Sequence, residues 1–250
     1  MSQPKVLVLA GRGLNCEIET LHAFSLVGIE GQIRHVDDVL APGFDLNAFN
    51  VLAVPGGFSF GDHTGAGKAL ANLLRDRLAE RFLAFMDQPD RLAIGICNGC
   101  QALVKSGLWD RQAETDSGQV SVASNAGGDY ICKWVQVSNQ APDSPWLNQV
   151  PGQLALPIAH GEGRFVATAE LSPALAYEGE NPNGSQQETA AVTGFDGRLI
   201  AMMPHPERAL RFTQQPDWTA KRERLRRAGE ALPADGPGLS IFRSAARWLG

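Results

Sequence analysis

The sequence predicts an α/β fold in which a mostly parallel sheet is flanked by helices in three layers and carries an antiparallel extension. Up to Gly107, short apolar segments alternate with helix-compatible segments, as in βαβ units whose sheet is covered on both faces. Beyond Gly107, strand-like segments follow one another without long helices between them, which predicts the antiparallel extension. The chain has 250 residues, and we expect residues 1–250 to form one domain.

The expected parallel strands are apolar segments that are too short to be helices. They lie at residues 6–10, 33–36, 51–54, 92–96 and 199–203. Apolar residues at helical spacing, Ile18 among them, predict an N-terminal helix with Asn15 as its N-cap and Gly28 just beyond its end. A long amphipathic helix is expected over 66–86, and a short helix over 101–105.

Beyond Gly107 the expected strands lie at 120–122, 131–137 and 154–159. The stretch from His160 to Arg164 interrupts two strand-like segments, and it is either a hairpin turn with a solvated ion pair or a turn whose polar residues face a site. A basic segment at 219–231 indicates a helix with a solvated face, with a docking surface for an acidic partner as the alternative. An amphipathic helix over 239–249 closes the chain.

The bulk composition argues against several classes of protein. The formal net charge is −5 and 44% of the residues are hydrophobic, so a sizeable core is available. No basic segment precedes the C-terminal fifth, so nucleic acid is not an expected partner. No apolar segment has the length of a signal-peptide core or a membrane-spanning helix. The four cysteines lack the spacing of a disulfide framework, so we expect a protein of the reducing cytoplasm.

The segment from Leu92 to Gly99 predicts a buried strand that turns sharply into a helix at Cys97. Small residues two before and two after the cysteine, Gly95 and Gly99, are typical of a nucleophile elbow, where a Cβ atom would clash. Such a turn lifts the Cys97 sulfur out of the sheet. It also places the N-terminus of the next helix beside the sulfur, which favours the thiolate.

Cys97 has two other interpretations. Free cysteine is among the most buried residue types, and the local pattern does not decide between a structural cysteine and a nucleophile. Cys97 and Cys100 also form a C-x-x-C pair, as in redox or metal sites. No second such pair and no histidines at zinc-finger spacing accompany it, so we expect no metal ligands.

A glycine-rich stretch from Pro55 to Asp62 follows the third expected strand directly. Taken alone, it is most simply a turn. With Cys97 on a neighbouring strand, however, the backbone N–H groups near Gly57 and at Asn98 would be able to bind an oxyanion. The later Gly-Ala-Gly-Lys sequence lacks the pattern of a phosphate-binding loop, so no nucleotide site is expected there.

His205 lies at the end of the last expected strand, between two prolines and two residues before Glu207. A carboxylate in that position can bind the far ring nitrogen, fix the tautomer and stabilise the imidazolium. A single histidine is more often structural, but this setting favours a general base. His63 is the rival base, in a loop next to Asp62.

Together, these motifs resemble class I glutamine amidotransferases and, among them, the glutaminase component of phosphoribosylformylglycinamidine synthase. The matching stretches lie at 56–62, 95–101, 160–163, 181–185 and 202–208, so the resemblance covers most of the chain. It implies a flavodoxin-like fold. It further implies that Cys97 is the nucleophile, His205 the general base and acid, and Glu207 the residue that orients His205.

The resemblance also implies the surroundings of the nucleophile. The N–H groups of the Gly57 region and of Asn98 would form the oxyanion hole. The side chains expected to line the glutamine pocket are those of Phe58, Gln101 and His160.

The implied reaction is hydrolysis of L-glutamine to glutamate and ammonia, which passes to an ATP-dependent synthetase subunit of purine biosynthesis. That subunit converts formylglycinamide ribonucleotide to the amidine. No cofactor is expected in this chain, because ATP and magnesium would bind the synthetase. A small bridging subunit is a further candidate partner, and no nucleic acid or membrane partner is expected.

The chain also differs from its apparent relatives. Some relatives are fused to the synthetase, whereas this chain starts at Met1 and is expected to be free-standing. The segment between Gly163 and Asn181 is shorter than in the fused relatives, and Phe60 stands where the family often has tyrosine. Two alternative functions are a related α/β cysteine hydrolase or peptidase and a non-catalytic regulatory subunit.

Overall fold

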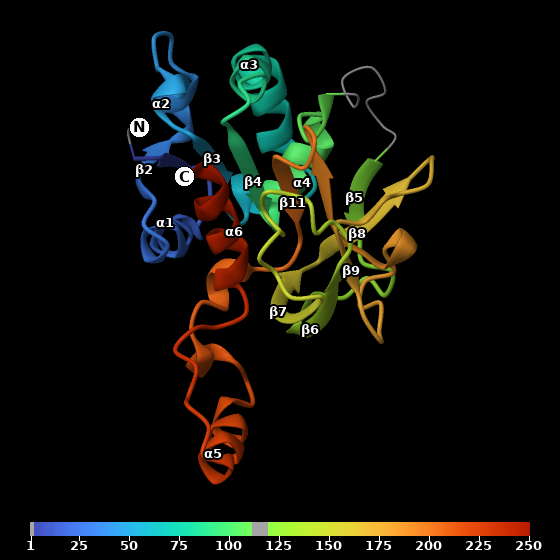
Figure 1. Ribbon diagram of the computed structural model, residues 1–250. Coiled ribbons are helices and arrows are strands. Elements are labelled where there is room, and N and C mark those ends of the chain that lie inside the picture. Colours follow the sequence, from blue (N-terminus) through green and yellow to red (C-terminus); the bar gives the residue numbers. More distant parts are fainter. Residues whose placement is uncertain (1–2, 112–119) are drawn as a thin grey trace.

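The computed structural model describes residues 3–111 and 120–250. A nine-stranded sheet with the strand order β2-β1-β3-β4-β11-β10-β9-β6-β7 runs through the molecule (Figure 1). Its strands are β1 (Lys5–Ala10), β2 (Glu30–His35), β3 (Val51–Val54), β4 (Leu92–Ile96), β6 (Ile131–Asn139), β7 (Gln153–His160), β9 (Leu175–Tyr177), β10 (Thr189–Gly194) and β11 (Leu199–Met202). A second sheet pairs β5 (Val120–Ser124) with β8 (Glu162–Ala167).

The strands β2, β1, β3, β4 and β11 are parallel and form the half of the sheet that the sequence predicts. Their order is the flavodoxin-like order 2-1-3-4-5 when β11 takes the place of the fifth strand. Every residue of β3, β4 and β11 is buried, which explains why these strands are continuous apolar segments without alternation. The edge strand β2 is the more polar and more exposed one.

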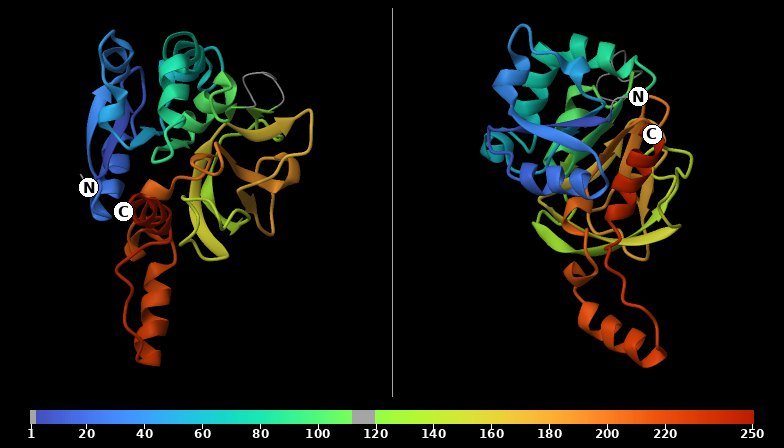
Figure 2. Two further views of the ribbon diagram at one scale, coloured as in Figure 1. Left: turned by 45° about the horizontal axis from the view of Figure 1, so that its top comes forward. Right: turned by 60° about the vertical axis from the view of Figure 1, so that its left-hand side comes forward.

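Helices cover both faces of this parallel half (Figure 2). They are α1 (Glu17–Leu26), α2 (Val36–Leu40), α3 (Lys68–Met86), α4 (Asn98–Ser106) and α6 (Leu239–Leu249). Helices α1 and α6 pack on one face, where the rings of Phe24 and Phe242 meet edge to face with their centroids 5.0 Å apart. Helices α3 and α4 pack together on the other face, with α4 directly against β4. The three predicted layers are confirmed.

The remaining strands of the large sheet form the antiparallel extension. Strand β10 runs antiparallel to β11, and β9, β6 and β7 continue the sheet in the same manner. The sequence does not predict β9 and β10, because β9 has only three residues and β10 carries mainly small side chains. A hairpin at His160–Arg164 is wrong, because β7 pairs with β6 whereas β8 pairs with β5.

Two further boundaries differ from the prediction for local reasons. Strand β2 pairs with β1 from Glu30 onward and ends at His35, whose side chain accepts the N–H of Asp37 at 3.2 Å and so begins α2. Helix α4 begins at Asn98, three residues before the expected start, because the elbow leads into it without a connecting loop.

Helix α1 also departs from the prediction at its start. Its N-cap is Cys16 and not Asn15, because the N–H groups of both residues donate to the carbonyl of Gly56 at 3.2 Å and hold this turn against the glycine-rich loop. Ile18 does not join the apolar face and is 71% exposed. Gly28 does follow the helix with a positive φ of 82°, as expected.

The basic helix α5 (Trp218–Ala228) lies at the tip of an arm that projects away from the sheet (Figures 1 and 2). None of its residues is buried, which fits both the solvated face and the docking surface that the sequence suggests. Glu223 forms ion pairs with Arg226 and Arg227 along the helix surface. Among the described residues, no helix is both long and apolar enough to cross a lipid bilayer.

Candidate active site

Cys97 occupies the turn between β4 and α4 in a strained backbone conformation. Its φ is 50° and its ψ −103°, a region that residues with a Cβ rarely adopt, and its N–H donates to the carbonyl of Met202 at 2.8 Å. The flanking glycines are required by close packing: a Cβ on Gly99 would lie 1.9 Å from the carbonyl oxygen of Val54, and one on Gly95 would lie 2.9 Å from that of Gly99. The predicted elbow is confirmed.

His205 follows β11, the strand that pairs in parallel with β4, so both strands end at the same edge of the sheet. Its N–H donates to the carbonyl of Pro157 at 2.8 Å, and its Nδ1 lies 2.6 Å from Oε1 of Glu207. His205 and Glu207 are 3% and 1% exposed. Burial by itself lowers the pKa of His205, but the Glu207 carboxylate, with Cys97 and Cys16, outweighs it and raises the pKa well above its usual value.

Cys16 lies beside the His205–Glu207 pair. The potential ligand atoms of these three residues lie within 4.8 Å of one another, as in a metal site. However, Oε1 of Glu207 is bound to Nδ1 of His205, and the guanidinium of Arg208 donates to the Cys16 sulfur at 3.0 Å. A cation there would have to displace or oppose that guanidinium, so we interpret the cluster as a hydrogen-bonded network.

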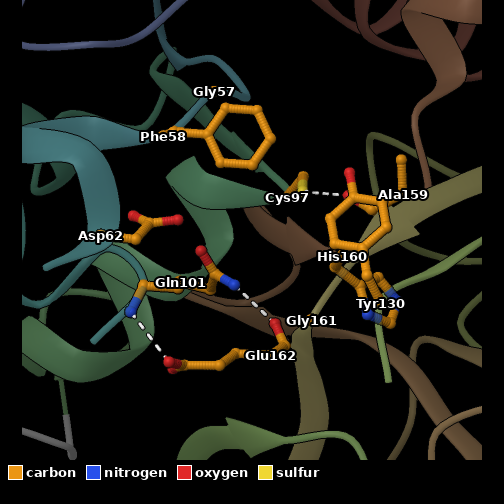
Figure 3. Close-up of a pocket in the computed structure, with 11 residues that line it drawn as sticks. Gly57, Phe58, Asp62, Cys97, Gln101, Tyr130, Ala159, His160, Gly161 and Glu162 are labelled. Carbon is orange, nitrogen blue, oxygen red and sulfur yellow. Dashed lines mark hydrogen bonds between the residues drawn. The ribbon is translucent and has the colours of Figure 1, made fainter. Parts of the chain in front are cut away.

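A cavity of about 210 Å³ opens beside the elbow (Figure 3). This is below the usual range for drug-sized ligands and suits a molecule of the size of an amino acid. The Phe58 and Tyr130 rings, 48% and 54% exposed, flank its mouth. The residues that line it are Gly57, Phe58, Asp62, Ala66, Cys97, Gln101, Tyr130, Ala159, His160, Gly161 and Glu162.

The side chain of Asn98 ties the glycine-rich loop to the elbow. Its Oδ1 accepts the N–H of Ser59 at 3.0 Å, and its Nδ2 donates to Oδ1 of Asp62 at 3.2 Å and to Oε1 of Gln101 at 2.9 Å. Gln101 in turn donates from Nε2 to the carbonyl of Glu162 at 2.5 Å. Both ends of the Gln101 amide are therefore engaged, and the residue links the elbow to the opposite wall of the cavity.

Two backbone N–H groups next to Cys97 are without an acceptor among the described residues, as donors of an oxyanion hole would be. Gly57 has a φ of 147°, and a Cβ there would lie 2.7 Å from the Cα of Leu14. The loop's backbone hydrogen bonds use the N–H of Phe58, which donates to Gly13 at 2.9 Å. The N–H groups of Gly57 and of Asn98, the first residue of α4, find no acceptor among residues 3–111 and 120–250.

His160 is 2% exposed and is held by Asn125, whose Oδ1 lies 3.1 Å from its Nδ1. The same oxygen accepts the N–H of Gly163 at 3.0 Å, so Nδ1 carries the proton and Nε2 is an acceptor. That Nε2 is buried and finds no partner among the described residues. Burial, together with the nearby His205, lowers the pKa of His160 to about 4, so the ring is neutral at pH 7.

The structure separates the other candidate groups from the cavity. Cys100 is completely buried, and burial raises the pKa of its thiol well above the usual value, which is the opposite of what a reactive C-x-x-C pair needs. All four cysteines are free. His63, the rival base, does not line the cavity.

Five of the expected site residues line the cavity directly: Gly57, Phe58, Cys97, Gln101 and His160. The sequence reasoning missed other residues of the site. Asp62 lies in the stretch 56–62, one of the motifs on which the family resemblance rests, so the sequence offered a reason to include it. Nothing in the sequence pattern marks Tyr130 or Asn125 as site residues. Glu162 does not form the solvated ion pair suggested for its stretch, because it pairs with Lys105 at 2.7 Å, whose side chain is only 10% exposed.

Comparison with known proteins shows the family to which the chain is similar. Residues 3–249 match the family model of the CobB/CobQ-like glutamine amidotransferase domain. The chain is 36% identical over 262 residues to the phosphoribosylformylglycinamidine synthase subunit PurQ of Dehalococcoides mccartyi, which covers 99% of this chain and 98% of the relative. It is 34% identical over 268 residues to the subunit of the same name from Methanococcus maripaludis, with 98% and 97% covered.

Two solved structures are similar over nearly their whole length. A chain of the PurLQS structure from Thermotoga maritima has a TM-score of 0.76 at 27% identity, with 100% of both chains covered. A glutamine amidotransferase from Thermotoga maritima has a TM-score of 0.60 at 15% identity, with 100% and 99% covered, and supports the fold alone. With its elbow, its buried histidine–glutamate pair and these relatives, the chain belongs to the CobB/CobQ-like glutamine amidotransferases and, among them, to the PurQ subunits of phosphoribosylformylglycinamidine synthase.

Proposed function

We propose that Cys97, His205 and Glu207 hydrolyse the side-chain amide of L-glutamine through a glutamyl thioester. One observation carries this assignment. The thiol at the strained elbow lines a cavity of amino-acid size, and the buried His205–Glu207 pair stands at the end of the adjacent parallel strand. Nucleophile, base and orienting group are thus supplied by two neighbouring strand ends.

The reaction begins with attack of the Cys97 thiolate on the Cδ carbonyl of glutamine. Nδ1 of His205 is bound to Glu207, so Nε2 transfers the protons. The imidazolium gives its proton to the leaving nitrogen as the C–N bond breaks and ammonia departs. The neutral ring then takes a proton from water, which attacks the thioester, releases glutamate and restores the thiolate–imidazolium pair. The raised pKa of His205 favours the imidazolium with which this cycle starts.

The tetrahedral intermediates carry a negative oxygen that needs donors. We assign this role to the N–H groups of Gly57 and Asn98, which have no acceptor among the described residues. The side chain of Asn98 is hydrogen-bonded to Ser59 and Asp62 and so holds the glycine-rich loop next to the elbow. Phe58 and His160 would contact the substrate from the cavity walls, with His160 acting as a neutral acceptor through Nε2.

Cys97 is the nucleophile in this proposal although Cys16 also lies beside His205. Cys97 lines the cavity and stands at a helix N-terminus. Cys16 is 1% exposed, does not line the cavity and accepts a hydrogen bond from Arg208. Burial also raises the pKa of the Cys16 thiol, although His205 partly offsets this effect.

The ammonia would serve an ATP-dependent synthetase subunit, and the relatives are named as subunits of phosphoribosylformylglycinamidine synthase. We further propose that ATP and magnesium bind that subunit, that a small bridging subunit joins the assembly, and that the complex works in the cytoplasm. The free cysteines fit a reducing compartment. Strong activation of glutamine hydrolysis when the synthetase, ATP and the ribonucleotide are added would support the coupling, whereas full activity of the chain alone would favour the independent-hydrolase alternative.

The residue assignment is tested with 6-diazo-5-oxo-L-norleucine, a glutamine analogue whose diazoketone alkylates a nucleophile placed where the amide binds. We expect a single adduct on Cys97, located by peptide mass spectrometry, and protection by excess glutamine. Cys100 and Cys16 serve as internal controls because both are buried outside the cavity. An adduct on Cys16, or one that glutamine does not prevent, would contradict the proposal.

A further inference from the structure

Asp62 has one carboxylate oxygen that accepts no hydrogen bond from the residues that the structure describes. Its Oδ1 accepts two hydrogen bonds, from the N–H of Gly67 at 3.3 Å and from Nδ2 of Asn98 at 3.2 Å. Its Oδ2 accepts none from residues 3–111 and 120–250. The residue lines the cavity, and Figure 3 shows its carboxylate turned toward the space between Phe58 and Gln101.

The backbone around Asp62 is strained, and hydrogen bonds to the Asp62 carboxylate hold it in this conformation. Asp62 has a φ of 54°, and it follows Phe60 and Gly61 with φ values of 55° and 68°. Left-handed residues other than glycine, such as Phe60 and Asp62, are costly and persist where the surroundings hold them, commonly at functional sites. Here the two hydrogen bonds to Oδ1 provide that restraint, because they hold the carboxyl group to α3 and α4.

The charge balance of the cavity favours a cation next to Asp62. The lining residues include no lysine or arginine, and the other lining carboxylate, Glu162, is already paired with Lys105 at 2.7 Å. Burial raises the pKa of Asp62, the N–H donors of Gly67 and Asn98 oppose this, and Glu162 raises it further. A positively charged group in the cavity would offset the cost of keeping this carboxylate ionised.

Glutamine carries such a group. In its extended form the α-nitrogen lies about 5 Å from the side-chain carbonyl carbon, four bonds of standard length away. Gln101, the expected contact, has both ends of its amide engaged by Asn98 and Glu162. Oδ2 of Asp62 accepts no hydrogen bond from the described residues, and unlike the amide oxygen of Gln101 it carries the negative charge that an ammonium group favours.

We propose that Oδ2 of Asp62 binds the α-ammonium group of the substrate and thereby selects an amino acid over a plain amide. This inference rests on the proposed glutaminase function and adds the residue that determines its specificity. Asp62 acts on recognition, while the bond-breaking steps remain with Cys97 and His205.

The test is Asp62→Asn, which retains Oδ1 for its two donors and replaces Oδ2 with an N–H₂ group. With the chain assembled on its synthetase, kcat/KM is measured for glutamine and for glutaramate, which is glutamine without its α-amino group. We expect D62N to lower kcat/KM for glutamine by about 10- to 100-fold, the range for losing a hydrogen bond between charged groups. The value for glutaramate should change by less than about 3-fold, since the ammonium is missing there.

Glu162→Gln is the matched control, because it removes the other carboxylate of the cavity. It should change kcat/KM for both substrates by the same factor, since Glu162 acts through Lys105 and the loop. If D62N leaves the ratio of kcat/KM for glutamine to kcat/KM for glutaramate unchanged, the inference is overturned and Asp62 has only a structural role in its loop. If the wild-type complex hydrolyses no glutamine, the proposed glutaminase function is wrong. This outcome differs from failure of the Asp62 inference, in which the wild-type complex is active and only the effect of D62N is not as expected.

A second readout does not depend on turnover. The rate at which Cys97 is alkylated should fall in D62N for 6-diazo-5-oxo-L-norleucine, which carries an α-ammonium group, and stay unchanged for iodoacetamide, which carries none. If D62N does not fold, Asp62→Ser offers an uncharged acceptor on the same loop and is read in the same way. Equal rates for both reagents relative to wild type would contradict the role of Asp62.

Discussion

Cys97 and Cys16 lie beside the same histidine, but in different surroundings. Cys97 is 5% exposed, stands at a backbone turn with a φ of 50°, and lines the cavity. Cys16 is 1% exposed, caps α1, and accepts a hydrogen bond from Arg208 at 3.0 Å. Both interact with His205, so proximity to the base is the feature that they share.

In the proposed mechanism, access and backbone geometry, more than closeness to a base, decide which thiol reacts. The elbow holds the Cys97 sulfur toward the cavity, where a carbonyl carbon can approach. Gly56 allows Cys16 to pack beside the histidine, because a Cβ there would come within 2.8 Å of the ring and 3.1 Å of the Cys16 sulfur. Cys16 nevertheless does not line the cavity. On this basis the two thiols should respond very differently to substitution.

The largest effect is expected for Cys97→Ala. Removing the nucleophile should lower kcat for glutamine hydrolysis by at least about 10⁴-fold, as for other triad nucleophiles. The fold should persist, because alanine retains a Cβ at this position and the cavity wall loses only a sulfur. Glutaminase assays of the assembled complex and circular dichroism of the chain would check both statements. Retained hydrolysis would remove Cys97 from the mechanism.

Glu207→Gln should have the next largest effect. It leaves the volume at Oε1 of Glu207 unchanged but removes the charge that raises the pKa of His205, so kcat should fall by about 10³-fold. The imidazolium should also deprotonate at lower pH than in wild type. Stability linked to His205, present below pH ~6.5 and lost as pH rises through its raised pKa, should shrink accordingly. An unchanged imidazole titration by NMR would contradict this role.

The substitution His160→Gln tests whether His160 is buried in its neutral form, because that burial makes the free energy of unfolding depend on pH. The folded-state pKa of His160 is about 4, below the unfolded value of ~6.5, so the unfolded state takes up the proton first. Stability is therefore lost as pH falls from 6.5 toward 4, and this residue should account for about 2 kcal/mol between pH 7 and pH 5. Urea unfolding at both pH values should show that H160Q lacks this share of the loss. Equal losses in both proteins would show that His160 is not buried in its neutral form.

Cys16→Ala should have the smallest effect on activity, with kcat/KM changed by less than about 5-fold and unfolding free energy lowered by about 1 kcal/mol. The sulfur packs beside His205 but does not reach the cavity. C97A in the same assay is the control. A loss as large as that of C97A would reverse the comparison and make Cys16 the nucleophile.

Much of the site could be predicted because its motifs are local. The spacing of Gly95, Cys97 and Gly99 predicts an elbow, since a Cβ at either glycine would lie only 1.9 to 2.9 Å from a backbone carbonyl oxygen. The proximity of Glu207 to His205 is likewise encoded within three residues of sequence. Buried parallel strands were recognisable because they are apolar on both faces.

Other parts of the site could not be predicted from the sequence because they depend on contacts between residues far apart in the chain. The engagement of Gln101 requires the carbonyl of Glu162, which is 61 residues away. The tautomer of His160 is fixed by Asn125 across the junction of two different sheets. Strand β10, with small side chains, forms only because β11 and β9 pair with it.

The sequence by itself determined the parallel half of the sheet, the elbow at Cys97 and the His205–Glu207 pair, because each depends on a few neighbouring residues. The tertiary structure decided which of two cysteines beside His205 lines the cavity and which oxygen of Asp62 accepts no hydrogen bond from the described residues. These outcomes follow from the order of the strands, with β11 placed beside β4 although more than 100 residues separate them. No local pattern encodes that order, since it minimises the free energy of the whole packed sheet.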